Sequence, residues 1–163
     1  MKEITWQLVR GREFSSRLIG WFGAGFYSHI DVITPAGDLR GARSDVIQGI
    51  PAGYEDRPQN YEQWAAATRY TLSVPDWKYH LYWEFSDAQL HKPYDSRGLI
   101  KAFVFGRRWR DDDSWWCSEE VAANGEYARL WNIPPEVKSV EPGDCAFLFV
   151  AAGAKREEMI PYT

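Results

Sequence analysis

The chain contains two side-chain types that together perform thiol chemistry, Cys117 and, far upstream, His29. Cys117 lies in the segment 115–121, WWCSEEV, where an acidic loop turns into a predicted helix. The positive end of a helix dipole and its unpaired N–H groups lower the pKa of a thiol in the first turn. The same N–H groups can donate to an oxyanion. Cys117 is therefore a candidate nucleophile, and the alternative is a small buried apolar residue.

His29 lies in the segment 27–33, YSHIDVI, which predicts a strand. Alternation along a strand puts His29 and Asp31 on one face and Ile30 and Val32 on the other. We expect Ile30 and Val32 to face the core and His29 to face a polar side or a cleft. An imidazole in a cleft can serve as a general base, and the alternative is a surface or hydrogen-bonded core histidine.

The remaining cysteine and histidines favour structural roles. Cys145 lies in a strongly apolar run and is expected in the core. His80 lies within an aromatic helix, and His91 lies at a helix end, where an imidazolium complements the dipole. No histidines and carboxylates share a metal-ligand spacing, and the acidic run 111–113 lacks the later residues of a calcium loop, so no metal and no cofactor are expected.

Composition narrows the class of protein. The net charge of −4 and the pI of about 5.4 argue against a nucleic-acid binder. Two cysteines favour free thiols in a reducing compartment. Neither a signal-peptide pattern nor a membrane-length apolar run occurs, so the expected product is cytoplasmic as synthesised, without a membrane span. Aromatic residues make up 16% of the chain, which predicts either a tryptophan-rich core or an aromatic-lined binding site.

Periodicity and turn residues predict a mixed order of elements. The predicted strands span 4–9, 26–34, 39–45, 66–74 and 145–151. The predicted helices span 15–22, 76–90, 96–105 and 115–130, with Asp113 or Ser114 capping the last and an apolar stripe on the second formed by Trp77, Leu81, Phe85 and Ala88. Residues 49–60 are expected to be loop, and the segment after Gly153 a polar tail. This order predicts a single α+β domain over 1–163, with an antiparallel sheet and helices packed on one side.

The order of these features resembles the circularly permuted branch of the NlpC-type papain-like superfamily, which includes YiiX-like proteins and permuted cell-wall peptidases. The resemblance covers residues 20–150. It rests on Ser28-His29 in a strand, a hairpin, a helix ending in KPYD (92–95), Cys117-Ser118-Glu119 opening a helix, and a PGD turn (142–144) before an apolar run.

The resemblance implies a papain-like fold in which Cys117 is the nucleophile and His29 the general base and acid. In such proteins a polar residue on the strand after the histidine orients the imidazole. That place falls near Gly41-Ala42, which offer no side-chain acceptor. Ser44 is taken as the candidate orienting residue, with Arg43 as the alternative, if the hairpin register is shifted or bulged. Asp31 shares a face with His29 but lies along the same strand. The Tyr94-Asp95 pair matches a recurring dipeptide and is expected to be structural, near the site.

The implied function is a cysteine amidase or peptidase that forms an acyl-enzyme on cell-wall peptides. The substrate, a peptide or an acyl group, would lie in a cleft lined by aromatic residues such as Trp21, Trp115 and Trp116. Synthesis without a leader fits a phage- or prophage-encoded enzyme delivered by a virion or released at lysis. Two alternatives are a hydrolase of lipid acyl groups and a catalytically impaired member that serves as a binding or virion module. A third is an acidic globular protein whose thiol and histidine lie apart.

Overall fold

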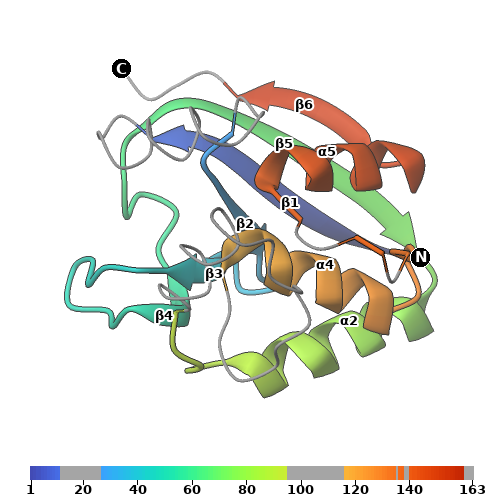
Figure 1. Cartoon of the computed structure of the whole chain (residues 1–163), viewed down its shortest axis with the longest axis horizontal. Helices are drawn as coiled ribbons and strands as arrows, with labels where there is room; N and C mark the ends of the chain where they lie inside the picture. Colours follow the sequence, from blue (N-terminus) through green and yellow to red (C-terminus); the bar gives the residue numbers. More distant parts are fainter. Residues whose placement is uncertain (12–26, 95–115, 135, 138–139, 160–163) are drawn as a thin grey trace.

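A computed structural model describes residues 1–11, 27–94, 116–134, 136–137 and 140–159 of the chain. Within these ranges six strands form one antiparallel sheet, in the order β4-β3-β2-β1-β5-β6, accompanied by three helices (Figure 1). The strands are β1 (Lys2–Gly11), β2 (His29–Ile33), β3 (Leu39–Arg43), β4 (Gly53–Arg57), β5 (Trp64–Val74) and β6 (Lys155–Met159). The helices are α2 (Asp76–Gln89), α4 (Cys117–Tyr127) and α5 (Pro142–Ala151). The α+β class and the antiparallel sheet are confirmed.

The helices pack on one face of the sheet, around Trp6 of β1. Trp6 is fully buried and donates its indole N–H to the hydroxyl of Tyr82 in α2, over 2.7 Å. Its ring stacks on Phe149 of α5, with centroids 4.4 Å apart. Ile30 and Val32 belong to the same cluster and are fully buried. The predicted core face of β2 is therefore correct.

The opposite face carries a smaller cluster beside β2. It joins four residues of the sheet to Tyr61, and the four are Val9, Leu39, Trp64 and Ala67. The rings of Tyr61 and Trp64 meet edge to face, with centroids 5.2 Å apart. Tyr61 comes from the connection between β4 and β5, so this connection covers the face on which His29 and Asp31 lie.

The run 145–151, predicted as a strand, is helix α5 instead. A short apolar run has no period that separates a buried strand from a buried helix. The preceding residues decide the outcome: Pro142 occupies the first turn, and the Asp144 carboxylate accepts from the Glu141 N–H over 2.9 Å, which forms part of a capping box.

Two strands were not predicted. The segment 49–60, expected to be loop, contains β4, whose polar sequence GYEDR pairs with β3. The expected polar tail contains β6, whose sequence KREEM pairs with β5 and forms one edge of the sheet. The described residues of β6 are exposed, so this strand needs no apolar alternation. β4 is mostly buried, but its buried residues include Glu55 and Arg57, and these polar side chains hide the strand pattern.

The buried face of α2 differs from its predicted stripe. Trp77 is 50% exposed and Ala88 is also exposed, whereas Tyr82, Trp83, Ser86 and Gln89 are buried. The buried face includes polar side chains because the sheet offers them partners, described below.

The start of helix α4 also differs from its prediction, and several predicted elements fall outside the described residues. Helix α4 begins at Cys117 with Trp116 at the N-cap, two residues later than expected. The predicted helices 15–22 and 96–105 and the predicted caps Asp113 and Ser114 lie outside the described residues. Within the described ranges, no helix is long and apolar enough to cross a membrane.

Candidate active site

Cys117 is the first residue of α4, and the start of this helix is held by one carbonyl. Trp116, the N-cap residue, has extended backbone and contributes no side-chain cap. The Ser118 hydroxyl donates to the Val140 carbonyl over 2.6 Å, and the Trp116 indole N–H donates to the same oxygen over 3.4 Å. Cys117 itself is 8% exposed. The thiol therefore lies at a fixed helix N-terminus, with the dipole and first-turn N–H groups beside it.

His29 is the first residue of β2, and its partner is a carboxylate on its own strand. The ring atom Nε2 lies 2.8 Å from Asp31 Oδ1, and both side chains are almost fully buried. An ionised carboxylate can only accept hydrogen bonds, so Nε2 carries the proton. In the neutral ring Nδ1 is then the basic nitrogen, the one that can take a proton from a thiol.

The charges around His29 favour the imidazolium. Burial lowers its pKa, but the Asp31 carboxylate and Cys117 raise it, with Arg43 opposing, and the net result is a pKa of about 9. Cys117 therefore lies close enough for its charge to act on the ring. A histidine with this pKa is protonated at neutral pH, which is the form that stabilises a thiolate.

Asp31 is held as an anion from two sides. Burial would raise its pKa, but the charge and hydrogen bond of His29, the charge of Arg43 and a hydrogen bond from Tyr61 lower it. The Tyr61 hydroxyl donates to Asp31 Oδ2 over 2.8 Å. The carboxylate that faces His29 is thus ionised and fixed in orientation.

Among the described residues, Asp31 makes the observed contact with His29, and Ser44, the expected orienting residue, lies in an exposed bend after β3. Arg43, the alternative orienting residue, pairs instead with Glu62, and its Nη2 lies 2.5 Å from Glu62 Oε2. Tyr61 and Glu62 were missed, because nothing in their sequence context connects them to a strand 30 residues away. Period-two alternation did identify Asp31 as sharing a face with His29.

Tyr94, expected near the site, is close to Cys117. Burial raises the pKa of its phenol, and the charge of Cys117 raises it further. Its neighbour Asp95 lies outside the described residues, as do Trp21 and Trp115 of the expected aromatic cleft. The third of these aromatic residues, Trp116, is 4% exposed and hydrogen-bonded inside the fold.

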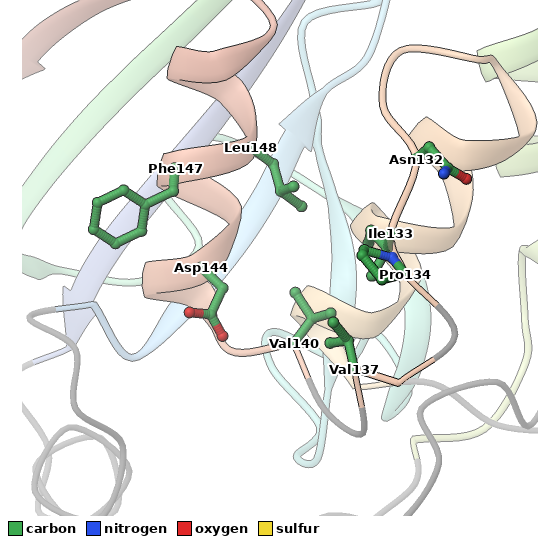
Figure 2. A pocket seen from close by; sticks show the side chains of 8 residues that line it. All are labelled: Asn132, Ile133, Pro134, Val137, Val140, Asp144, Phe147 and Leu148. Carbon is green, nitrogen blue, oxygen red and sulfur yellow. The ribbon is translucent and has the colours of Figure 1, made fainter.

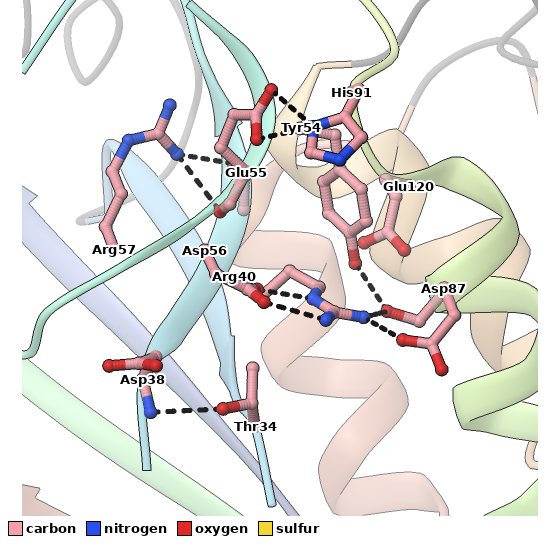
Figure 3. A network of polar contacts seen from close by, with 12 residues as sticks. Thr34, Asp38, Arg40, Tyr54, Glu55, Asp56, Arg57, Asp87, His91 and Glu120 are labelled. Carbon is pink, nitrogen blue, oxygen red and sulfur yellow. Dashed lines mark hydrogen bonds and ion pairs between the residues drawn. The ribbon is translucent and has the colours of Figure 1, made fainter. Parts of the chain in front are cut away.

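A partly buried polar network joins α4 to α2 and the sheet (Figure 3). Arg40 of β3 pairs with Asp56, Nε to Oδ1 2.5 Å, and with Asp87 of α2, Nη1 to Oδ1 2.6 Å. Tyr54 of β4 is hydrogen-bonded to Ser86 of α2, with the two hydroxyl oxygens 2.9 Å apart.

The network reaches α4 through Glu120, three residues after Cys117. Its Oε1 accepts from Asn124 over 3.2 Å, and its carboxyl also bonds Tyr54. Burial raises the pKa of Glu120 to about 7, although Tyr54, Arg40 and Asn124 oppose the rise. Glu120 therefore faces this network. A change in its protonation alters the charge beside residues of α2, β3 and β4.

An open apolar hollow of about 330 Å³ lies elsewhere, between α5 and the segment after α4 (Figure 2). Its lining residues are Asn132, Ile133, Pro134, Val137, Val140, Asp144, Phe147 and Leu148. None of the residues around His29 lines it. Its connection to the site is Val140, whose carbonyl holds the start of α4.

Cys145 is fully buried and its burial raises the pKa of its thiol, in accord with the expected core role. His80 is exposed on α2, and His91 follows α2 and pairs with Glu55, Nδ1 to Oε2 2.9 Å. Within the described ranges, no group of three or more His, Cys, Asp and Glu side chains could hold a metal ion.

No family model and no curated protein sequence matches this chain. Among solved structures, the chain is similar to the crystal structure of metalloprotein YiiX (DUF1105) from Escherichia coli O157:H7. The TM-score is 0.51 with 16% identity, over 88% of this chain and 77% of that one. At this identity the similarity establishes a related fold. The YiiX-like part of the sequence expectation is confirmed at that level.

Proposed function

We propose that this protein is a cysteine hydrolase with a circularly permuted, NlpC-type papain-like fold. One observation carries the proposal: a buried His29, hydrogen-bonded to Asp31, lies within charge range of a thiol that opens a helix. The similarity to YiiX is consistent with this fold. Asp31 weakens the alternative of an impaired binding or virion module, because that alternative assumed an imidazole without an orienting group.

The proposed reaction begins from a thiolate and an imidazolium. In this pair the proton of Cys117 already lies on His29 Nδ1, and the thiolate Sγ attacks the carbonyl carbon of an amide or ester. First-turn N–H groups of α4 donate to the oxyanion that forms. His29 then protonates the leaving amine or alcohol, which leaves a thioester. Water, deprotonated by His29, attacks the thioester, and Cys117 leaves as thiolate.

The reactivity of Cys117 with iodoacetamide tests the pairing with His29. We expect alkylation at about pH 6, where an ordinary thiol with a pKa of roughly 8.5 is almost wholly protonated. Replacing His29→Ala should slow alkylation at that pH roughly tenfold or more, because the thiolate loses its counter-charge. Peptide mass spectrometry separates Cys117 from Cys145, and the exposed His80→Ala is the matched control. A Cys117 that titrates near 8.5 with or without His29 would contradict the proposal.

The class of substrate is a separate question. We propose cell-wall peptide amides, acted on after delivery by a phage particle or release at lysis. Purified muropeptides and phospholipid vesicles are compared as substrates, with Cys117→Ala as control. A new amine released from muropeptides supports the proposed amidase. Release of fatty acid from the vesicles, without a new amine, would contradict it and support a lipid acyl hydrolase instead.

A further inference from the structure

We propose that Tyr61 is a positioning residue of this site, and that Gly41 and Tyr61 together make Asp31 the group that orients His29. This inference rests on the proposed function. It concerns how one strand supplies both the imidazole and its carboxylate, an arrangement that requires space on the neighbouring strand and a second partner for the carboxylate.

The space is provided by Gly41 of β3. A Cβ at this position would lie 2.0 Å from Asp31 Oδ1 and 3.0 Å from the Ile30 carbonyl oxygen. The first distance is far inside van der Waals contact, and Oδ1 is the atom that bonds His29. Any side chain at position 41 would therefore displace the carboxylate. Gly41 therefore accounts for both features of the site. It provides no acceptor for His29 on β3, and it leaves room for Asp31 to provide one on β2.

The second partner is Tyr61. Asp31 is 1% exposed, so an oxygen without a donor would cost its full desolvation penalty. His29 satisfies Oδ1 and the Tyr61 hydroxyl satisfies Oδ2, each over 2.8 Å. Two bonds on opposite oxygens fix the plane of the carboxylate. The plane in turn fixes the direction of the Nε2 bond, and so the direction in which Nδ1 points.

The position of Tyr61 is itself determined by its neighbours. Its ring packs edge to face against Trp64, and the guanidinium groups of Arg43 and Arg57 lie 5.6 and 5.9 Å from its centroid. Arg57 also donates to the Gly41 carbonyl over 2.8 Å. Arg57 therefore contacts both Gly41, which leaves space for the Asp31 carboxylate, and Tyr61, which donates to its second oxygen.

Replacing Tyr61→Phe tests this role, since it keeps the ring and removes only the donor. The charged groups that face Asp31 and His29 are Cys117 from α4, Arg43 from β3, Arg57 from β4 and Glu62 beside Tyr61, and none of them is altered. We expect alkylation of Cys117 by iodoacetamide at about pH 6 to slow roughly tenfold, the lower end of the effect of losing one hydrogen bond to a charged group. The acid limb of the pH profile should move to higher pH, because Asp31 becomes easier to protonate.

A spectroscopic readout separates positioning from folding. In the wild type, the hydrogen-bonded Nε2–H of His29 should give a protected proton signal in ¹⁵N-edited NMR, and in Tyr61→Phe this signal should broaden or vanish. Tyr82→Phe is the matched control: it also removes a buried hydroxyl, one bonded to Trp6 on the other face of the sheet. It should keep both the signal and the alkylation profile.

Gly41 provides the second test. Gly41→Ala should reproduce the loss seen in Tyr61→Phe. Asp31→Ala should be slower still, and the double variant Asp31→Ala, Gly41→Ser should recover part of the rate, because a hydroxyl on β3 then occupies the vacated space. Wild-type behaviour of both Tyr61→Phe and Gly41→Ala, with His29→Ala still slow, would overturn this inference and leave the proposed function standing. A wild-type profile in His29→Ala would overturn both.

Discussion

At the scale of single residues, the site is defined by which atoms of His29 are engaged. Nε2 bonds a buried carboxylate, and the thiol acts on the same ring. Arg43 opposes the imidazolium but is paired with Glu62, which limits its influence. The balance favours a protonated ring, and this preference must also appear in the stability of the fold.

The pH dependence of unfolding tests this preference. The pKa of His29 is about 9 in the fold, above its ordinary 6.5, so its stabilising contribution is complete below about pH 6.5 and is lost as pH rises through 9. The difference in unfolding free energy between wild type and His29→Gln should fall by on the order of 3 kcal/mol across this window. Urea titrations at several pH values measure it. A constant difference would contradict the preference, and His80→Gln is the control.

At the scale of elements, the sequence predicts those whose pattern is strong and local. Helix α2 and strands β2, β3 and β5 were predicted within a few residues, because periodicity and turn residues mark them. Strands β4 and β6 are polar and become strands only because β3 and β5 offer free edges, a property of the tertiary structure. Helix α5 was mistaken for a strand because its core is uniformly apolar.

The cap of α5 should contribute measurably to stability. Asp144→Ala removes the acceptor for the Glu141 N–H and should lower the unfolding free energy by about 1 kcal/mol. Asp144→Asn keeps an acceptor oxygen at this place and should lose distinctly less. Chemical denaturation followed by circular dichroism compares the two. Equal losses would mean that the charge at the helix start, rather than the hydrogen bond, stabilises α5.

At the scale of the whole molecule, the site lies where the helical layer meets the connection that covers the other face of the sheet. The order of His29 and Cys117 in the chain predicts that they pair, since a family resemblance preserves order, and this pairing stays a prediction. Tyr61 could not be predicted, because its contact with Asp31 depends on how the β4–β5 connection folds back. The single domain over 1–163 stays a prediction.

The network around Glu120 joins α4 to α2, β3 and β4, so its titration should act on the whole fold. The pKa of Glu120 is about 7 against an ordinary 4.5, so wild-type stability falls as pH rises from 4.5 through 7. Relative to the wild type, Glu120→Gln should gain on the order of 3 kcal/mol of unfolding free energy across this window. Urea titrations measure the gain. The exposed Glu3→Gln should change stability by less than about 0.5 kcal/mol, and an equal profile for both variants would contradict the burial of charge at Glu120.

The central place of β1 has a consequence for how the protein folds. β1 pairs with β2 on one side and with β5, some sixty residues further along the chain, on the other (Figure 1). Strands β4, β3 and β2 lie on one side of β1, and β5 and β6 lie on the other. These two halves of the sheet are joined only through β1. Closing so long a loop costs entropy before its contacts form, which makes the joining of the two halves a late and slow step. Until that step the half that carries His29 would expose the strand edge that β1 later covers, so association between chains should compete most strongly during refolding.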